Sequence, residues 1–326
     1  MTVHIVTPPT VPGTRIAGLG HYRPDNVVTN DDLAQHIETN DEWIRSRVGI
    51  AERRFSSPDE TVASMGANAG RAALADAGLT PADIDAVITA TCTLDAPIPH
   101  ASTRIAAALG IHAPGSFDVN AACAGFCYGL AVASQAVRSG NARNVLVVGS
   151  EKLTSWIDPK DRANSIIFAD GAGAAVVTAS DTEQIGPIAW GSDETQTETI
   201  YIADRNSFVY QEGQSVFRWA TSAIAPVAVQ AAKNAGIDLA DVDIIACHQA
   251  NLRIVDAIAK RLISAGARPD VRVARDIVTT GNTSSASIPI ALDRMRAAGE
   301  AQRGDVVLAV GFGAGLTYAS QVFVCP

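Results

Sequence analysis

One pattern of residues occurs twice in the chain at a fixed offset, and this repeat constrains the fold more than any other feature. Residues 77–88 and 235–245 both read as the end of an Ala-rich helix, a turn that begins with Ala-Gly, and then a buried strand. Residues 117–119 match residues 275–277 at the same offset of 158 positions. Shared turn chemistry is the alternative explanation, but two matches at one offset favour an internal duplication.

Each half of the chain has the pattern of a layered α/β structure. Short apolar segments such as 145–149 and 306–310 alternate with Ala-rich segments, which is typical of mainly parallel strands covered by helices. With 47% hydrophobic residues in 326 positions, the chain can build a large core. We therefore expect an α/β fold of two duplicated halves, residues 1–180 and residues 181–326.

The composition argues against several classes of protein. No apolar run approaches the roughly 20 residues of a membrane-spanning helix, and residues 1–9 lack the pattern of a signal peptide. A net charge of −9 argues against nucleic-acid binding. The five cysteines do not have the spacings of a disulfide framework or a zinc site. We expect a cytoplasmic protein that binds neither membrane nor nucleic acid and holds no metal.

Three polar residues lie where strands give way to turns or helices. Cys123 begins a predicted buried helix, whose N-terminus lowers the pKa of a thiol; a buried structural cysteine is the alternative. His248 follows a predicted strand at 242–247 and suits proton transfer or hydrogen-bond donation, although many histidines only pack in the core. Asn282 lies in a Gly-Asn-Thr turn and can donate two hydrogen bonds without charge, or simply cap the turn.

The repeat predicts that these residues meet. At an offset of 158, Cys123 matches Gly281, the neighbour of Asn282. Equivalent junctions of two packed halves can face each other across the centre, and active sites of α/β folds gather at the carboxyl ends of strands. We expect one shared site.

Three motifs carry a resemblance to a known family: Asn-Ala-Ala-Cys at 120–123, His-Gln-Ala-Asn at 248–251 and Gly-Asn-Thr-Ser at 281–284. In this order and spacing they closely resemble β-ketoacyl-[acyl-carrier-protein] synthase III, a condensing enzyme of the thiolase superfamily. The resemblance extends over almost the whole chain, including 39–44 and 311–315. It implies a thiolase-like fold, with two α/β halves packed as a layered αβαβα body.

The resemblance also implies a decarboxylative Claisen condensation that initiates fatty acid or polyketide chains. Cys123 would take an acyl group from acyl-CoA, the substrate, with no separate cofactor. His248 and Asn282 would stabilise the charge that develops when malonyl-acyl carrier protein loses CO₂. The backbone N–H of Cys123 would form a second oxyanion hole. The resemblance assigns further oxyanion-hole and cavity positions to Gly313, Ala314 and Phe312.

Substrate-binding residues follow from the same resemblance. Trp43 would stack on the adenine of coenzyme A beside Arg47 and Arg162, although a packed surface aromatic is the alternative for Trp43. Family members are homodimers, and Ile98 would reach into the partner's acyl pocket. A basic cluster is our candidate for docking the acidic carrier protein, with a solvated helix face as the alternative; it comprises Arg218, Arg253, Lys260 and Arg261.

Departures from the family leave the substrate open. The segment 194–209 is shorter than in many relatives, and the loop 91–99 differs from its usual form. The starter acyl group, its length and the choice between fatty acid and polyketide pathways therefore stay open. An acyltransferase on the same fold, a non-catalytic partner subunit and a chalcone-synthase-like enzyme are the alternatives. The presence of cysteine, histidine and asparagine together disfavours the first two, and the third is a longer chain that uses coenzyme A thioesters throughout.

Overall fold

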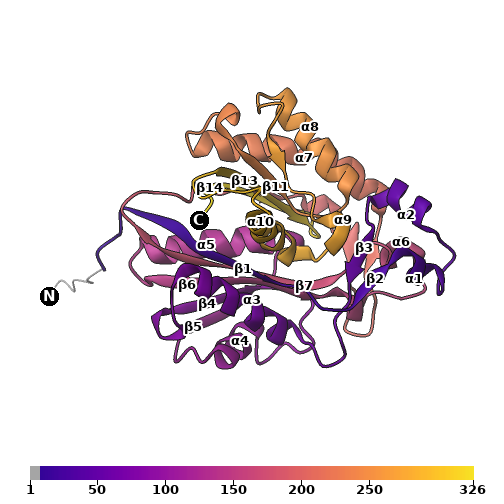
Figure 1. Cartoon of the computed structure of the whole chain (residues 1–326), viewed down its shortest axis with the longest axis horizontal. Helices are drawn as coiled ribbons and strands as arrows, with labels where there is room; N and C mark the ends of the chain where they lie inside the picture. Colours follow the sequence, from indigo (N-terminus) through magenta and orange to yellow (C-terminus); the bar gives the residue numbers. More distant parts are fainter. Residues whose placement is uncertain (1–7) are drawn as a thin grey trace.

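The structure is a computed structural model of the chain, and it describes residues 8–326. Two five-stranded sheets lie one above the other, with helices between and outside them (Figure 1). Within the described residues, no helix is both long and apolar enough to span a bilayer. Residues 1–7, part of the segment read for a signal peptide, lie outside the described residues.

The two sheets have the same strand order. The first contains, in spatial order, β1 (Gly13–Tyr22), β7 (Asp170–Ser180), β6 (Asn144–Lys152), β4 (Ala86–Ala90) and β5 (Gly115–Val119). The second contains β8 (Ala189–Ser192), β14 (Thr317–Val324), β13 (Val306–Gly313), β11 (Ile244–Cys247) and β12 (Arg272–Val273). Corresponding strands pair in the same parallel or antiparallel sense in both sheets. The predicted duplication is confirmed.

The prediction of mainly parallel sheets was wrong, because only half of the strand pairings in these two sheets are parallel. In each sheet the two pairings on one side are parallel, whereas the two on the other side are antiparallel. In the second half, only residues 314–316 join β13 to β14. A connection this short makes a hairpin, because a parallel crossover needs a dozen or more residues.

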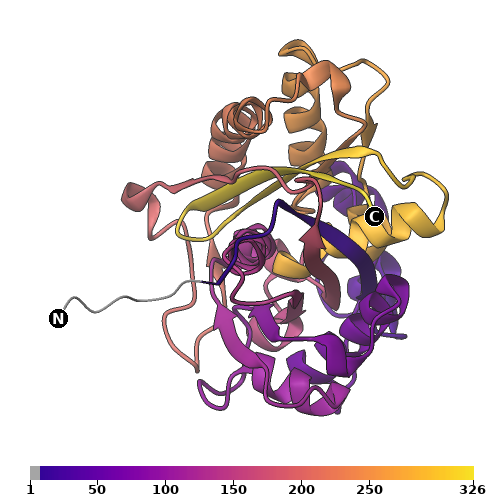
Figure 2. The ribbon, with the colours of Figure 1, turned by 90° about the vertical axis from the view of Figure 1, so that its left-hand side faces the viewer.

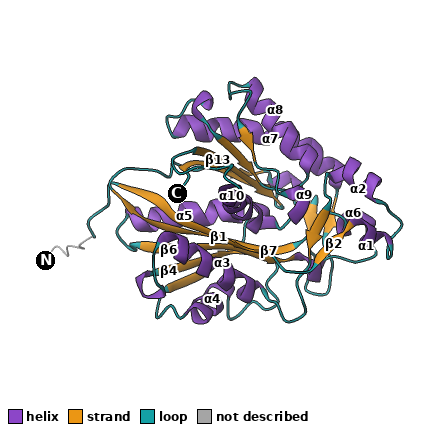
Figure 3. Ribbon diagram, in the orientation of Figure 1, coloured by secondary structure: helices purple, strands orange, loops and turns teal. Residues whose placement is uncertain are grey.

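Helices complete five layers, as the family resemblance predicted. The helices α3 (Val62–Ala77) and α4 (Ala101–Leu109) cover the outer face of the first sheet, and α7 (Gly213–Asn234) and α8 (Leu252–Ser264) cover that of the second. Between the sheets lie α5 (Gly125–Arg138) and α10 (Ser287–Ala297), as two views of the ribbon show (Figure 1, Figure 2). Figure 3 shows the same αβαβα order by secondary structure.

Both halves share one apolar core. The largest cluster of buried side chains combines Phe126 of α5, Val147 of β6, Ile288 of α10 and Val307 of β13. Side chains from each half therefore bury one another, and this burial favours folding as one body. The division at residues 180 and 181 stays a prediction.

Several short elements lie together at one end of the sheets (Figure 1). They are β2 (Val27–Thr29), α1 (Asn30–Ala34), α2 (Asp41–Val48), β3 (Glu52–Arg54), α6 (Arg162–Ser165) and α9 (Ile277–Thr280). A small hairpin, β9 (Ile200–Tyr201) and β10 (Tyr210–Gln211), completes the structure. The helix α2 begins at an N-cap, where the Asn40 side chain accepts a hydrogen bond from the Trp43 N–H at 2.8 Å.

Candidate active site

Cys123 lies at the junction of β5 and α5, in a 3₁₀ turn over Ala122–Ala124. The α-helix expected to begin at Cys123 begins two residues later, at Gly125. Ala122 has a left-handed backbone conformation, with φ at +45°, which is costly for a residue with a Cβ. The chain holds this conformation directly before Cys123, whose side chain lines a cavity.

His248 follows β11, and several contacts fix its ring. Its backbone N–H donates to the Val310 carbonyl at 2.7 Å. The ring Nδ1 lies 2.7 Å from the hydroxyl of Ser287, the first residue of α10. The ring packs against Phe312 edge to face at 5.3 Å. The imidazole is buried and held in one orientation.

Asn282 is held by its backbone beside the segment 167–169, which precedes β7. Its N–H donates to the Ile167 carbonyl at 2.9 Å, and its carbonyl accepts from the Ala169 N–H at 2.9 Å. The side-chain oxygen accepts from the Ser284 N–H at 2.8 Å. The Nδ2 group makes a long contact of 3.5 Å with the Ala250 carbonyl, so it retains donor capacity for a ligand.

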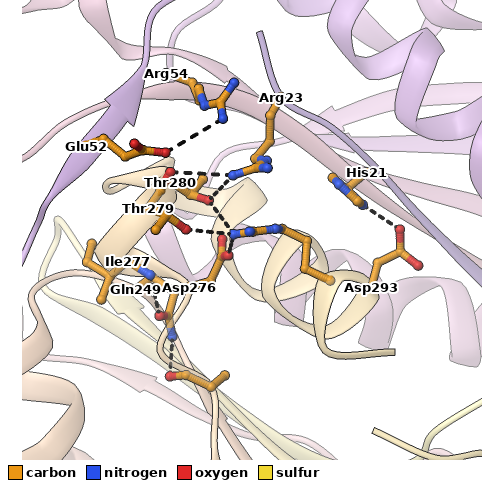
Figure 4. A network of polar contacts seen from close by, with 12 residues as sticks. His21, Arg23, Glu52, Arg54, Gln249, Asp276, Ile277, Thr279, Thr280 and Asp293 are labelled. Atoms are coloured by element: carbon orange, nitrogen blue, oxygen red, sulfur yellow. Dashed lines mark hydrogen bonds and ion pairs between the residues drawn. The ribbon is translucent and has the colours of Figure 1, made fainter. Parts of the chain in front are cut away.

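Gln249 ties the His248 segment to the segment that carries Asn282. Its Nε2 donates to the Ala274 carbonyl at 3.1 Å, and its Oε1 accepts from the Ile277 N–H at 3.0 Å (Figure 4). Ile277 is the first residue of α9, and Asn282 lies two residues beyond the end of this helix. The two donor side chains thus share one rigid support.

An ionic network holds α9 from its other side (Figure 4). Asp276 pairs with Arg294 of α10, and Arg23 donates to the Thr280 hydroxyl at 3.2 Å. Between β1 and α10, His21 Nδ1 lies 2.6 Å from the Asp293 carboxylate. Both halves therefore contribute to the support of Asn282.

One cavity of about 910 Å³ brings the predicted site residues together. Its lining includes Cys123, His248, Asn282, Phe312, Gly313 and Ala314. The Gly313 backbone packs directly on the cysteine, since a Cβ built there would lie 2.8 Å from the Cys123 Cβ and 3.0 Å from its backbone N. A residue larger than glycine at position 313 would push the nucleophile from its place.

The electrostatics of the cavity differ from the expectation for the thiol. Burial raises the pKa of Cys123 to about 12; hydrogen bonding with Ser284 lowers the pKa, and nearby Glu151 raises it further. The effect of burial on the pKa of Cys123 therefore outweighs the lowering that we expected from the helix N-terminus. Burial also lowers the pKa of His248 to about 3, so its imidazole is neutral at physiological pH and suited to donating a hydrogen bond.

Three further polar residues border the site and were not predicted: Glu151, Ser284 and Ser287. The sequence held one usable signal, because Glu151 follows the apolar segment 145–149. The predicted strand 145–149 is too short, because β6 continues to Lys152 and so includes Glu151. A fully buried carboxyl group at the carboxyl end of a strand is typical of a site.

The predicted adenine-binding residues are in contact with one another. The guanidinium carbon of Arg162 lies 4.7 Å from the ring centre of Trp43, and that of Arg47 lies 5.6 Å from it. Arg47 also lines the cavity. These residues form a stack at the rim, which an adenine could enter between Trp43 and one arginine.

The basic cluster divides into two parts. Arg218 of α7 and Arg253 of α8 line the cavity, and the Arg253 guanidinium lies 5.2 Å from the Phe217 ring. Lys260 and Arg261 are exposed about two turns further along α8 and do not line it. Only the first part is at the entrance.

Two other predicted specificity elements differ in their position relative to the cavity. Ile98 is 79% exposed and does not line it, although its neighbours Ala96 and Pro97 do. The short segment 194–209 does reach the cavity, where Ile200, Tyr201 and Val209 contribute to the wall.

Comparisons with known proteins agree with this geometry. Family models described as 3-oxoacyl-[acyl-carrier-protein (ACP)] synthase III and its C-terminal part match residues 117–194 and 232–325. A β-ketoacyl-[acyl-carrier-protein] synthase III from Streptomyces coelicolor is 46% identical over 317 residues, which cover 96% of this chain and 99% of the relative. One from Mycobacterium avium is 47% identical over 323 residues, with 95% of each chain covered.

Solved structures show the same likeness. The priming β-ketosynthase from the R1128 polyketide biosynthetic pathway superposes with a TM-score of 0.94 at 42% identity, covering 98% of both chains. The 3-oxoacyl-[acyl-carrier-protein] synthase III from Aquifex aeolicus superposes with a TM-score of 0.91 at 37% identity, covering 96% of this chain and all of that one.

Proposed function

Because the chain belongs to the 3-oxoacyl-[acyl-carrier-protein] synthase III family, we propose that it condenses an acyl-CoA starter with malonyl-acyl carrier protein through an acyl-Cys123 intermediate. The product is a 3-oxoacyl thioester that begins a fatty acid or polyketide chain. The observation that carries this proposal is the single cavity lined by Cys123, His248 and Asn282.

In the first half-reaction, the Cys123 sulfur attacks the acyl-CoA carbonyl and coenzyme A leaves. The tetrahedral intermediate needs hydrogen-bond donors for its oxyanion. The backbone N–H groups of Cys123 and of the segment Gly313–Gly315 are the candidates. The close packing of Gly313 on Cys123 supports this role, because it brings the two backbones together beside the sulfur.

In the second half-reaction, malonyl-acyl carrier protein loses CO₂ and its carbanion attacks the acyl group. His248 and Asn282 donate hydrogen bonds to the thioester oxygen, where negative charge develops. Two observations support this role. His248 is neutral at physiological pH and carries one ring N–H. The Oδ1 of Asn282 accepts from the Ser284 N–H, which orients the side chain so that its Nδ2 group can donate to a ligand. Loss of one such donor costs about 10²–10³ in rate.

The two substrates enter over the same rim. We propose that the Trp43, Arg47 and Arg162 stack binds the adenine nucleotide of acyl-CoA, which requires one arginine to move from the indole face. Arg253 and Arg218 at the cavity entrance receive the acidic carrier protein. Lys260 and Arg261 extend this docking surface along α8 and contribute through longer-range attraction.

We further propose a cytoplasmic homodimer in which Ile98 fills part of the partner's acyl pocket. The exposure of this apolar side chain beside cavity-lining residues supports the proposal, because a dimer would bury it. Ile98→Glu should convert the dimer to monomers in sedimentation analysis. A dimer that persists unchanged would argue against this contact.

The test of the function is a CO₂-release and product assay with malonyl-acyl carrier protein and a panel of acetyl-, isobutyryl- and hexanoyl-CoA. We expect one or more starters to give a 3-oxoacyl-carrier-protein product of the matching mass, and Cys123→Ala to give none. Acyl transfer to another acceptor without CO₂ release would favour the acyltransferase alternative instead.

A further inference from the structure

Glu151 is a fully buried carboxyl group that the steps above do not use. It lies near the carboxyl end of β6, surrounded by hydroxyl groups. Its Oε1 accepts from Ser284 Oγ at 3.0 Å and from Ser285 Oγ at 2.8 Å. Its Oε2 accepts from Thr91 Oγ1 at 3.0 Å and from Thr93 Oγ1 at 2.6 Å. Four hydroxyl donors on one carboxyl group are typical of an ionised carboxylate.

The proposed chemistry lacks a base for the first half-reaction. Burial raises the pKa of the Cys123 thiol to about 12, so a proton must leave the thiol as the sulfur attacks the thioester. His248 is a weak base, because its conjugate acid has a pKa of about 3. One of its ring nitrogens also already bonds Ser287. A second group is needed to receive the proton.

Ser284 contacts the Glu151 carboxylate and lines the same cavity as the Cys123 thiol. The 3₁₀ turn Ser284–Ala286 packs against the turn that carries Cys123, and Ser284 lowers the pKa of the nearby Cys123 thiol. The Ser284 hydroxyl also lies 3.8 Å from the sulfur of Cys92. The same hydroxyl donates to Glu151. Ser284 has a left-handed φ of +49°, a strained conformation of the kind that clusters at functional sites. The Ser284 N–H meanwhile orients Asn282.

We propose that Ser284 and Glu151 form a proton relay for Cys123, a role that rests on the acyl-cysteine function proposed above. As the Sγ–C bond forms and the C–S bond to coenzyme A breaks, the thiol proton moves to the Ser284 oxygen. The Ser284 proton moves at the same time to Glu151. Coenzyme A leaves with the electron pair of the broken bond and takes a proton from solvent.

The second half-reaction returns the proton. When the carbanion attacks the acyl group, the C–Sγ bond breaks and its electron pair stays on the Cys123 sulfur. Glu151 gives its proton to Ser284, which passes its own to the sulfur and restores the thiol. The relay therefore ends each turnover in its starting state.

Ser285 can stabilise the protonated form of Glu151 in the interval between the two half-reactions. Its hydroxyl lies 2.8 Å from Glu151 and 2.9 Å from the Ala90 carbonyl. One hydroxyl proton can serve only one acceptor at a time. When Glu151 becomes protonated, Ser285 can donate to Ala90 and accept from the carboxylic acid.

The surroundings of Glu151 suit a base. Burial raises its pKa above the usual carboxyl value, while hydrogen bonds, with Thr93 and Ser285 foremost, work in the opposite direction. The titratable groups that face it are thiols, Cys92 from the loop after β4 and Cys123 from the turn before α5. A carboxylate with a raised pKa is a stronger proton acceptor than an exposed one.

The test measures acylation alone, as the burst of coenzyme A release with the fastest starter of the panel, from pH 5 to pH 10. Wild type should show a limb that rises with pH as Glu151 ionises and then a plateau. Glu151→Gln and Ser284→Ala should each lose about 10²–10⁴-fold at neutral pH, the usual contribution of a positioned base. In both variants the rate should keep rising with pH as the thiol itself ionises.

Three comparisons separate a relay from a structural role. The double variant should be no slower than either single variant, because the two groups act as one unit. Glu151→Asp should recover part of the rate and the pH limb. Decarboxylation of malonyl-acyl carrier protein, which needs no thiol proton transfer, should stay within about threefold of wild type.

A matched control removes a hydroxyl group that donates to the other carboxylate oxygen of Glu151. Thr93→Val deletes a 2.6 Å bond to Glu151 Oε2 without touching the path through Ser284, and acylation should change by a few-fold at most. The relay is refuted if Glu151→Gln keeps the wild-type pH profile of acylation, or if acylation and decarboxylation of malonyl-acyl carrier protein slow by the same factor. If Glu151→Gln does not fold, the pH profile of Ser284→Ala decides.

The experiment also separates failure of the relay from failure of the proposed function. If wild type forms no acyl adduct on Cys123 with any starter, the condensing function fails. If wild type acylates and the variants acylate equally fast, only the relay fails.

Discussion

Gly313→Ala is the substitution whose effect follows most directly from the geometry. The added Cβ would lie 2.8 Å from the Cys123 Cβ and 3.1 Å from its sulfur. An ordinary carbon contact is about 3.5–4.0 Å, so the two segments must separate by about 0.7 Å or more. A displacement of about 1 Å at a reacting centre can cost on the order of 10²-fold. We expect acylation to slow by about that factor.

The assay is rapid-mixing measurement of coenzyme A release, with thermal unfolding as the check on folding. Gly115→Ala is the matched control, because the nearest atom to its added Cβ is the Ala86 Cβ at 3.6 Å, an ordinary contact. That variant should acylate at the wild-type rate. A folded Gly313→Ala enzyme that acylates as fast as wild type would refute the claim that this glycine sets the position of the nucleophile.

Three further predictions concern the rim and the buried histidine. Trp43→Ala or Arg162→Ala should raise the KM for acyl-CoA about fivefold, as expected for loss of about 1 kcal/mol of cation–π and stacking contact; an unchanged KM would remove the stack from the binding site. Arg253→Glu should raise the KM for malonyl-acyl carrier protein while acyl-CoA loading stays intact, and the difference from wild type should shrink in high salt; equal KM values at low salt would count against the docking surface. Burial holds the pKa of His248 near 3, whereas an unfolded histidine titrates near 6.5. The unfolded chain therefore binds a proton between these values that the folded chain does not, and stability falls as pH decreases through this window. His248→Gln should flatten the fall in denaturant unfolding experiments, and an unchanged slope would show that the folded histidine titrates normally.

The sequence predicted the architecture because the duplication left a visible trace. Two matches at one offset were enough to expect two equivalent sheets, and the strand orders agree. The antiparallel pairings were missed because buried strands of either direction have similar apolar composition. Only the length of a connection, such as residues 314–316, separates the two cases.

Site residues that lie in a local sequence motif could be predicted. Residues that only the fold brings to the site could not. Cys123, His248 and Asn282 each lie in a distinctive motif, and they line one cavity. Ser284 and Glu151 are 133 positions apart in the chain, and no local pattern links them. The raised pKa of Cys123 was missed for a related reason, because burial depends on what packs around the thiol and not on its helix.

The most direct test of the account is to separate the two half-reactions in single variants. Cys123→Ala should form no acyl adduct by intact mass yet still release CO₂ from malonyl-acyl carrier protein. His248→Ala and Asn282→Ala should form the adduct and release CO₂ at least about 10²-fold more slowly. An adduct that survives in Cys123→Ala, or CO₂ release that survives loss of His248 and Asn282 together, would contradict the shared site.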